Sequence, residues 1–388
     1  MNLEAIFEAN ALTIAAIGRG APWHWANLSR AIAQIGPAYD GLQDAESPWA
    51  PWKTLNFAAM MRAQPNRLCA VVATARNEGP YLLEWIAHQR AVGFEHVFIY
   101  TNDNTDGSEI VLRLLHEAGV ITLIESSNGP GCAPQKKSYE HSVHLLRPLR
   151  EFEWVAYFDI DEFVIPDQRF NYDIRNFLND GMARLRGHPP GAVLLNWDWY
   201  GSDGHVRRSD GLVQRRFTVR RDYGTVKCIA HLPSITRMDY VHTPDFTVRL
   251  VNSSFNPTTI TPWQVLPIDY SGARLNHYFH KSFEEFANKK FRGIGDQPVD
   301  GVGRDFNSFF QWQPNAVSGS KREPPAALMD RVERNMADLA HIPGVSEAVQ
   351  DTVGAHKRIA DAMFGGDIGT AYAVAERAAT EDWMRSQV

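Results

Sequence analysis

The most informative stretch of this chain runs from Trp154 to Pro166 and reads W-V-A-Y-F-D-I-D-E-F-V-I-P. Its apolar run stops at Asp159 and Asp161 and then resumes. Residues two apart in a strand point the same way, so the pattern predicts two carboxylates side by side at a strand end. Like charges this close repel unless a cation lies between them. The simplest such cation is Mn²⁺ or Mg²⁺ completed by phosphate oxygens, which suggests an enzyme that handles a nucleotide diphosphate.

The sequence before this stretch alternates apolar runs with helix signals. The apolar runs predict buried strands over residues 68–74, 96–100, 120–124 and 154–158. Helices are predicted between them, over residues 79–92, 106–119 and 135–149. Pro80 suits the first turn of a helix, Gly93 suits its end, and Asp106-x-x-Glu109 resembles a capping box.

This alternation predicts an α/β fold with a doubly wound, mostly parallel sheet and flanking helices. Ligands of such sheets bind beyond the carboxyl ends of the strands. Three polar clusters of the sequence fall at that edge, namely Asn77–Glu78, Asn102–Asp103 and Asp159-x-Asp161. We therefore expect them to converge on one site.

The remaining chain predicts a less regular second half and two helical extensions. Short strands are expected over 192–197, 212–219, 226–230 and 246–251, followed by a helix over 281–292. The predicted organisation is a helical N-terminal extension (1–66), an α/β domain (67–320) and a helical C-terminal tail (321–388). Within the domain, we expect a nucleotide-binding half over 67–166 and an acceptor half over 190–295.

Composition limits the partners. The chain has 388 residues, a net charge of −6 and no block of basic residues, which argues against a nucleic-acid partner. Its three cysteines show no paired spacing, and no stretch of about 18 apolar residues is present. The acidic N-terminal residues are unlike a secretory signal. We expect a cytoplasmic protein, with peripheral contact to a membrane left open.

Five short motifs occur along the chain, and their order is the basis for comparing it with known families. They are A-R-N-E (75–78), Y-T-N-D-N-T-D-G-S (100–108), F-D-I-D-E-F (158–163), W-D-W-Y-G-S-D-G-H (197–205) and L-N-H-Y-F-H-K-S-F-E-E-F (275–286). The glycine patterns of dinucleotide-binding and P-loop proteins are absent. Over residues 68–295 the chain resembles the GT-A glycosyltransferases, and within them the family 92 and family 2-like enzymes. The resemblance implies a GT-A, Rossmann-like fold and a sugar-nucleotide donor, most often a UDP-sugar.

The resemblance also implies a divalent metal ion, Mn²⁺ or Mg²⁺, at the D-x-D positions. Asp159 and Asp161 match those positions, although two acids of this kind also occur in solvated surface turns. Many GT-A enzymes add a histidine ligand from a later strand, and His242 and His277 are the candidates here. A lone histidine is more often an ordinary hydrogen-bonding residue.

Donor-binding residues are expected at two places. In this superfamily the positions of Asn77, Glu78 and Asp103 line the nucleoside pocket, and Arg76 can pair with phosphate. Capping of strand ends and helix starts explains these residues equally well. Lys227, Lys281 and Arg292 are expected to contact the diphosphate, because a departing dianion needs donors beyond the metal; they fit exposed charges as well.

An inverting reaction needs a base for the acceptor hydroxyl. GT-A enzymes usually take it from an acid after the D-x-D motif, and the first candidate here is Asp203, with Asp198 second. The sequence around Asp203 also suits a simple turn, since Gly201 and Gly204 flank it. Trp197 and Trp199 can stack on an acceptor sugar or belong to the core.

The leading interpretation is thus a metal-dependent, inverting glycosyltransferase with a glycan or glycolipid acceptor. A sugar-nucleotide nucleotidyltransferase needs a glycine-rich phosphate loop with basic residues, where this chain has A-R-N-E-G-P at 75–80. A non-catalytic carbohydrate-binding module is the third alternative, and the intact D-x-D motif argues against it.

Overall fold

The structure is a computed structural model that describes residues 32–43, 65–238, 240–244, 248–261, 263–298, 305–311, 313–314 and 319–386. Most of the helical extension predicted over 1–66 lies outside these ranges. Its described part forms a strand, β1 (Ala33–Ile35), and a 3-10 helix, η1 (Pro37–Gln43). The strand β1 pairs with β4, so this segment extends the central sheet.

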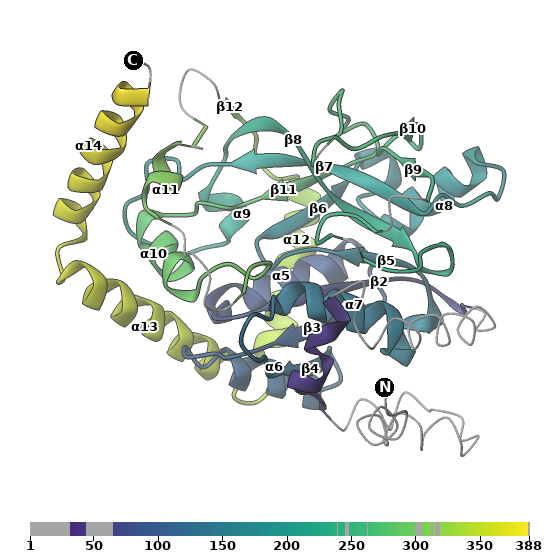
Figure 1. The fold of residues 1–388 in the computed structure, drawn as a ribbon, viewed down its shortest axis with the longest axis horizontal. Coiled ribbons are helices and arrows are strands. Elements are labelled where there is room, and N and C mark those ends of the chain that lie inside the picture. Colours follow the sequence, from purple (N-terminus) through teal and green to yellow (C-terminus); the bar gives the residue numbers. More distant parts are fainter. Residues whose placement is uncertain are drawn as a thin grey trace.

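The twelve strands that the structure describes form one sheet (Figure 1). Its first half is parallel and follows the predicted strand–helix alternation. In spatial order this half contains β1, β4 (Thr122–Ser126), β3 (His96–Thr101), β2 (Arg67–Ala75) and β5 (Phe152–Tyr157). The carboxyl ends of β2, β3 and β5 therefore meet at one edge.

The second half of the sheet is mixed, which the sequence did not indicate. The long strand β8 (Val219–His231) runs antiparallel to both β5 and β7 (Ala192–Tyr200). Next to β7 lies β11 (Ala273–His277) in parallel, and β6 (Glu162–Pro166) closes this edge antiparallel to β11. The short strands are β9 (Leu250–Val251), β10 (Pro257–Thr258) and β12 (Ser320–Lys321).

Helices cover both faces of the sheet. Alternate residues of β2 enter two different cores, because successive side chains of a strand point to opposite faces. Cys69, Val71 and Ala73 pack with helices α5 (Gly79–Ala91), α6 (Ser108–Glu117) and α12 (Ala326–Ala340). Ala70 and Val72 face α7 (Pro134–His144) on the other side.

The remaining helices lie between and after the strands. They are η2 (Arg147–Glu151), η3 (Gln168–Phe170), α8 (Ile174–Arg184), α9 (Val213–Arg216), η4 (Leu232–Ser234), α10 (Phe283–Arg292), α11 (Asn307–Gln311), α13 (Val345–Phe364) and α14 (Ile368–Ser386). None of the described helices has the length and apolar character needed to cross a membrane. The predicted helix over 281–292 is confirmed by α10, and helices occupy most of the C-terminal tail.

Three local predictions were wrong. Residues 212–219 were expected to form a strand, but Val213–Arg216 form α9 and β8 begins only at Val219. Helix α7 ends at His144 rather than near 149. Asp106 does not close a capping box, because Gly107 is the N-cap of α6 at φ 90°, and the Asp106 side chain accepts from the backbone of Ser108.

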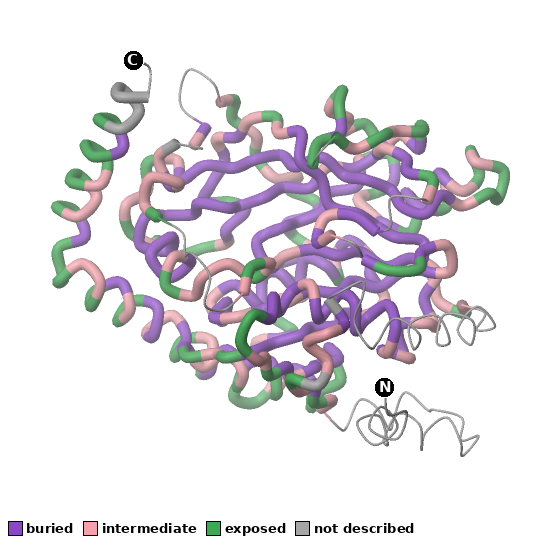
Figure 2. Tube along the Cα trace, viewed as in Figure 1, coloured by how far each residue is buried: buried purple, intermediate pink, exposed green. Residues whose placement is uncertain are grey.

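Figure 2 shows how burial is distributed: the sheet is buried, while α14 is largely exposed or intermediate. Helix α12 packs on α5, and α13 packs on α5, α6 and α10. The C-terminal helices thus support the layer that lies behind the parallel half of the sheet.

Candidate active site

A cavity of about 420 Å³ opens at the carboxyl ends of β2, β3 and β5. This is where ligands of open α/β sheets bind. Strands β7, β8 and β11 and helix α10 complete its walls, which include Thr74, Arg76, Glu78, Asn102, Gln135, Asp159, Asp161, Trp197, Trp199, Lys227, Tyr240, His242, Trp263, His277, Lys289, Arg292 and Asp296.

Asp159 and Asp161 both line the cavity, although they do not lie in a strand. Strand β5 ends at Tyr157 and β6 begins at Glu162, so both aspartates occupy the turn that joins these strands. The buried side chain of Ile160 anchors this turn in the core. The expected pair of neighbouring carboxylates is therefore presented by a tight connection.

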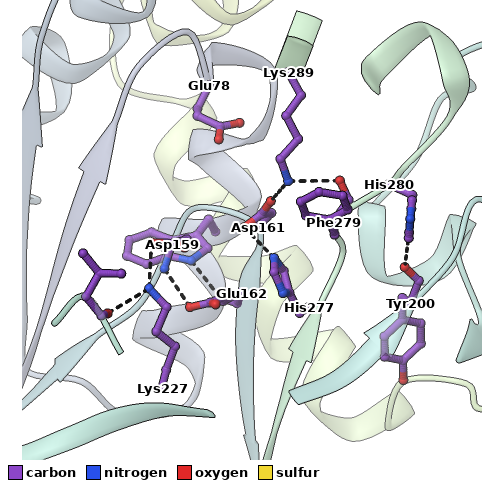
Figure 3. Close-up of polar contacts among 12 residues, drawn as sticks. Glu78, Asp159, Asp161, Glu162, Tyr200, Lys227, His277, Phe279, His280 and Lys289 are labelled. Atoms are coloured by element: carbon purple, nitrogen blue, oxygen red, sulfur yellow. Dashed lines mark hydrogen bonds and ion pairs between the residues drawn. The ribbon is translucent and has the colours of Figure 1, made fainter. Parts of the chain in front are cut away.

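Asp159 is held by the amide group of Gln135 and by the ammonium group of Lys227, the second of which is labelled in Figure 3. Its Oδ1 accepts from Gln135 Nε2 at 2.5 Å and from Lys227 Nζ at 3.1 Å. Lys227 also donates to the carbonyl of Val241 at 3.2 Å. Burial acts to raise the pKa of Asp159, but the charge and hydrogen bond of Lys227, together with His277, bring the pKa below its usual range. Asp159 and Lys227 therefore form a charged pair.

Asp161 is also paired with a lysine, Lys289, which lies on helix α10. Lys289 donates from its Nζ to Asp161 Oδ2 and to the carbonyl of Phe279, and His277 Nε2 lies 3.4 Å from Asp161 Oδ1 (Figure 3). Burial acts to raise the pKa of Asp161, yet Lys289 and His277 hold it well below its usual range. Each aspartate of the D-x-D motif thus has its own lysine.

Glu162 stabilises the turn through a hydrogen bond to its backbone. Its Oε2 accepts from the backbone N–H of Asp159 at 2.9 Å, and its side chain is fully buried. Burial raises the pKa of Glu162 well above its usual range, which favours the neutral carboxyl. Glu162 thus adds a hydrogen bond to the turn, while burial disfavours a third negative charge beside the two aspartates.

His242 and His277 both contact the ring of Trp197. The centroid of Trp197 is 5.3 Å from that of His242 and 4.3 Å from that of His277. His242 Nδ1 lies 2.8 Å from the carbonyl of Val226, so it carries the proton and leaves a lone pair on Nε2. Burial lowers the pKa of His242 to about 3 and also lowers that of His277. Both rings are therefore in the neutral form that binds metal ions.

These side chains fit a divalent ion whose coordination is completed by a ligand. Within the described residues, no three histidine, cysteine or acidic side chains already converge as a closed metal centre. Two carboxylates with a neutral imidazole beside them instead form a partial donor set that phosphate oxygens can complete. Carboxylate ligands combined with imidazole suit Mn²⁺ better than Mg²⁺.

Four of the residues predicted to bind the donor line the cavity, namely Arg76, Glu78, Lys227 and Arg292. Glu78 is paired with Arg292, which also donates to the carbonyl of Arg76 at 3.2 Å. Arg76 reaches across to the next loop, where its Nε donates to the carbonyl of Asp103 at 3.3 Å. Arg76 and Arg292 thus bring two guanidinium groups to the cavity wall.

The structure places three other predicted donor-binding residues away from the cavity wall. Asn77 adopts φ 50°, and its Oδ1 accepts from the backbone of Thr105 at 2.7 Å. Asp103 is exposed, while its neighbour Asn102 lines the cavity. The ammonium of Lys281 lies 4.3 Å from the ring centroid of Tyr81, beside a much smaller pocket. Asn77 and Lys281 have contacts that shape the local backbone and packing.

Asp203, the first candidate base, does not line the cavity. Its Oδ2 accepts from Thr218 N at 2.7 Å and from Thr218 Oγ1 at 3.0 Å, and its Oδ1 accepts from Val219 N at 3.0 Å. The backbone of Asp203 has φ 50°. These contacts fasten a turn to the start of β8.

Asp198, the second candidate, lies in β7 and is fully buried. It contacts Arg220, Arg322 at 2.5 Å and Arg274 at 3.8 Å. Three guanidinium groups therefore surround a carboxylate that does not line the cavity.

Several cavity residues were missed or only partly indicated by the sequence. Lys289 and Arg292 lie three positions apart on α10, a spacing that places two side chains on one helix face. Arg292 was among the predicted diphosphate contacts, whereas Lys289 was not. Their pairing with Glu78 and Asp161 is a tertiary contact. Gln135, Trp263 and Asp296 carried no local signal at all.

Comparisons with solved structures give distant matches. The crystal structure of S. aureus TarS 1–349 matches at a TM-score of 0.30 and 12% identity, covering 82% of this chain and 92% of that one. The same fragment in complex with UDP matches at a TM-score of 0.29 and 13% identity, covering 82% and 92%.

Comparisons at the sequence level are more specific. A glycosyltransferase family 92 protein of Arabidopsis thaliana is 25% identical over 263 residues, which cover 66% of this chain and 41% of that protein. One of Oryza sativa subsp. japonica is 31% identical over 251 residues, covering 62% and 41%. The chain thus spans about two fifths of the length of these relatives. The profile of glycosyltransferase family 92 matches residues 72–308, and on this match the chain belongs to glycosyltransferase family 92.

Proposed function

We propose that this chain is a hexosyltransferase that moves a sugar from a nucleotide diphosphate donor, most simply a UDP-sugar, to a glycan or glycolipid acceptor. The proposal includes a divalent metal ion and inversion at the anomeric carbon. The observation that carries it is the meeting of Asp159 and Asp161 with Lys227, Lys289 and two neutral imidazoles in one cavity. Membership of family 92 supports the transfer of a sugar.

The charges of the cavity support a donor that binds together with a metal ion. Three of the four carboxylates in the wall are each paired with one basic side chain: Asp159 with Lys227, Asp161 with Lys289 and Glu78 with Arg292. The fourth carboxylate, Asp296, and the guanidinium of Arg76 add one charge of each sign. A diphosphate diester adds two negative charges and a divalent ion adds two positive charges. Because the cavity is already balanced, either ligand alone leaves an uncompensated charge, whereas both together do not.

The residues proposed to hold the ion are the two aspartates of the turn and the histidines His242 and His277. When bound there, Mn²⁺ or Mg²⁺ supplies Lewis-acid stabilisation of the charge that develops on the diphosphate. Lys227 and Lys289 can then turn from the aspartates to the phosphate oxygens, because their ammonium groups sit at the ends of flexible stems. Arg76 and Arg292 add donors in the same wall.

The decisive experiment measures UDP binding by isothermal titration calorimetry, with Mn²⁺ and with EDTA. We expect Mn²⁺ to tighten UDP binding, and Asp161→Asn to remove this enhancement. Asp210→Asn makes the same chemical change on the exposed surface and serves as the control. Equal affinity for UDP in Mn²⁺ and EDTA would rule out the metal-dependent site and leave the lysines as the diphosphate ligands.

A second measurement tests the reaction itself. Release of UDP from a panel of UDP-hexoses identifies a donor, and NMR of the anomeric proton of the product gives the stereochemistry. Inversion is expected for a single displacement, and net retention would exclude it. Release of a sugar 1-phosphate in place of UDP would favour the nucleotidyltransferase alternative.

A further inference from the structure

The cavity has a second group of side chains that the donor does not explain. Tyr240 and Trp263 line it together, with ring centroids 4.4 Å apart and an interplanar angle of 26°. Tyr240 also stacks on His242 at 5.0 Å. A continuous series of rings therefore leads from the proposed metal ligand His242 to Trp263.

Trp263 differs from the other tryptophans of the cavity in its exposure. It is 45% exposed, whereas Trp197 and Trp199 are 9% and 2% exposed. The rings of Trp197 and Trp199 are covered by aromatic neighbours such as His277 and Phe279, so they belong to the core. A stacked pair with one ring open to a cavity offers an apolar face, which suits the C–H-bearing face of a sugar ring.

Asp296 lies in the same part of the cavity, in the loop that follows α10. The backbone of this loop is fixed to α7, because Gln135 N–H donates to the carbonyl of Gly295 at 3.0 Å. Burial raises the pKa of Tyr240, and the negative charge of Asp296 adds to this effect, in keeping with a position near that ring. Asp296 therefore borders the aromatic pair.

Asp296 also differs from the other carboxylates of the cavity wall. Glu78, Asp159 and Asp161 each form an ion pair with a lysine or arginine. For Asp296, no such pair is found within the part of the chain that the structure describes. The side chain of Asp296 is half-buried in the cavity wall, so its carboxylate oxygens can accept a hydrogen bond from a hydroxyl of a bound acceptor.

We propose that Tyr240 and Trp263 form the platform on which the acceptor sugar stacks, and that Asp296 is the base for its attacking hydroxyl. This inference rests on the proposed function. The hydroxyl oxygen forms a bond to C1 of the donor sugar, and its proton passes to Asp296. The bond from C1 to the diphosphate oxygen breaks, and its electron pair leaves with the nucleoside diphosphate.

The platform is tested by saturation-transfer NMR, with UDP and Mn²⁺ present. The probes are the methyl glycosides of glucose, galactose, mannose and N-acetylglucosamine at millimolar concentration. We expect at least one glycoside to receive saturation from the wild type and to lose it in Trp263→Ala. Phe291→Ala, which removes another exposed aromatic ring outside the cavity wall, should retain the signal. Equal signals in Trp263→Ala, or no signal from any glycoside with the wild type, would overturn the platform.

The base is tested with Asp296→Asn. Hydrolysis of the UDP-hexose, in which water takes the place of the acceptor, should fall about 10²- to 10⁴-fold, while the affinity for UDP and Mn²⁺ stays within twofold. The rise of the rate with pH should also disappear, which a purely structural role would not produce. Asp210→Asn should behave as the wild type in both measurements.

The outcomes separate the two levels of the proposal. A wild type that neither binds UDP nor releases it from a donor would remove the proposed function and this inference with it. A wild type that does both, with Asp296→Asn retaining full turnover, would remove only the assignment of the base. Loss of UDP binding in Asp296→Asn would also overturn that assignment, because it would place Asp296 on the donor side.

Discussion

At the scale of single residues, the two lysines of the cavity carry buried charges that cost free energy of folding. Lys227 and Lys289 are buried, and moving a charge out of water costs several kcal/mol, which the partner aspartate repays only in part. Buried ion pairs of this kind are weak sources of stability. We therefore interpret the lysines as groups that keep Asp159 and Asp161 ionised and ready for a metal ion and a diphosphate.

Replacing Lys289 by methionine should shift two affinities in opposite directions. Without the ammonium, Asp161 has one competitor fewer, so Mn²⁺ alone should bind more tightly. UDP in the presence of Mn²⁺ should bind about tenfold more weakly, because a charged donor to the phosphates is lost. Calorimetric titrations measure both. Lys290→Met is the matched control on the same helix, and parallel changes of both affinities would contradict the exchange of partners.

Asp203 should prove important for stability. Its carboxylate accepts from the backbone of Thr218 and Val219, and Asp203→Ala removes these bonds from a turn at φ 50°. We expect the free energy of unfolding to fall by about 1–3 kcal/mol in urea denaturation. Release of UDP per folded molecule should stay near the wild-type value. A loss of turnover with unchanged stability would restore Asp203 as the candidate base.

Site residues were predictable from the sequence when their signal lay in neighbouring residues, and not when it came from a contact between distant ones. Asp159 and Asp161 stand out because apolar residues flank them on both sides, a pattern visible in a window of thirteen residues. Lys289 meets Asp161 from 128 positions away, and only the packing of α10 creates that contact. Trp263 and Asp296 resemble ordinary loop residues until the fold places them at the same cavity.

At the scale of elements, helix α10 connects the site to the body of the protein. Ser282 and Glu285 form a capping box at its start, and Lys289 and Arg292 reach the cavity from its last turns. Glu285 also binds both guanidinium nitrogens of Arg216 at 2.8 and 2.9 Å. One carboxylate thus fixes the N-terminus of the helix that carries two cavity cations.

Because of the Glu285–Arg216 pair, the free energy of unfolding should fall measurably at low pH. Burial acts to raise the pKa of Glu285, but Arg216 and Ser282 lower it to about 2 from 4.5. The lowered pKa contributes stability that is complete above about pH 4.5 and is lost as the pH falls towards 2. We expect Glu285→Gln to unfold about 3 kcal/mol more easily at pH 7, with a smaller deficit at pH 3. Chemical denaturation at both pH values measures this, and an equal deficit at both would contradict the linkage.

The error over residues 212–219 shows why element predictions fail. Leu212, Val213 and Phe217 suggest a strand, yet the backbone N–H groups of Val213 and Gln214 donate to the carboxylate of Glu84 at 2.7 and 3.2 Å. Glu84 lies 129 positions before Val213, on α5. A distant carboxylate thus caps a short helix that local propensity does not favour. Four of the five strands of the parallel half were predictable because each coincides with an apolar run. The fifth, β1 (Ala33–Ile35), falls in the segment expected to be helical, and a glutamine interrupts its apolar residues.

At the scale of the whole molecule, the C-terminal helix α13 contacts residues that border the cavity turn before α5. His356 on α13 donates from Nε2 to Asp106 at 2.9 Å, and Asp106 accepts from the backbone of Gly79 at 3.3 Å. Thr352 lies so close to Gly79 that a Cβ there would be 2.3 Å from its methyl carbon. Helix α13 therefore supports the turn that carries Glu78 into the cavity.

Two truncations should separate the roles of the last two helices. Ending the chain after Gly366 removes α14, which packs mainly on α11 and α13 and also places Tyr372 against Phe283 of α10. We expect a fall in Tm of a few degrees with UDP binding retained. Ending it after Gly344 also removes α13, and with it the buried side chains of Val345, Ala355 and His356. That loss should destabilise the chain by ~5 kcal/mol or more and weaken UDP binding, because the turn before α5 loses its support.

Differential scanning calorimetry and UDP titration measure the stability and the UDP affinity of both truncated proteins. His356→Ala in the full chain provides a milder version of the second truncation. Full UDP affinity in a folded protein that ends at Gly344 would show that the site stands without α13.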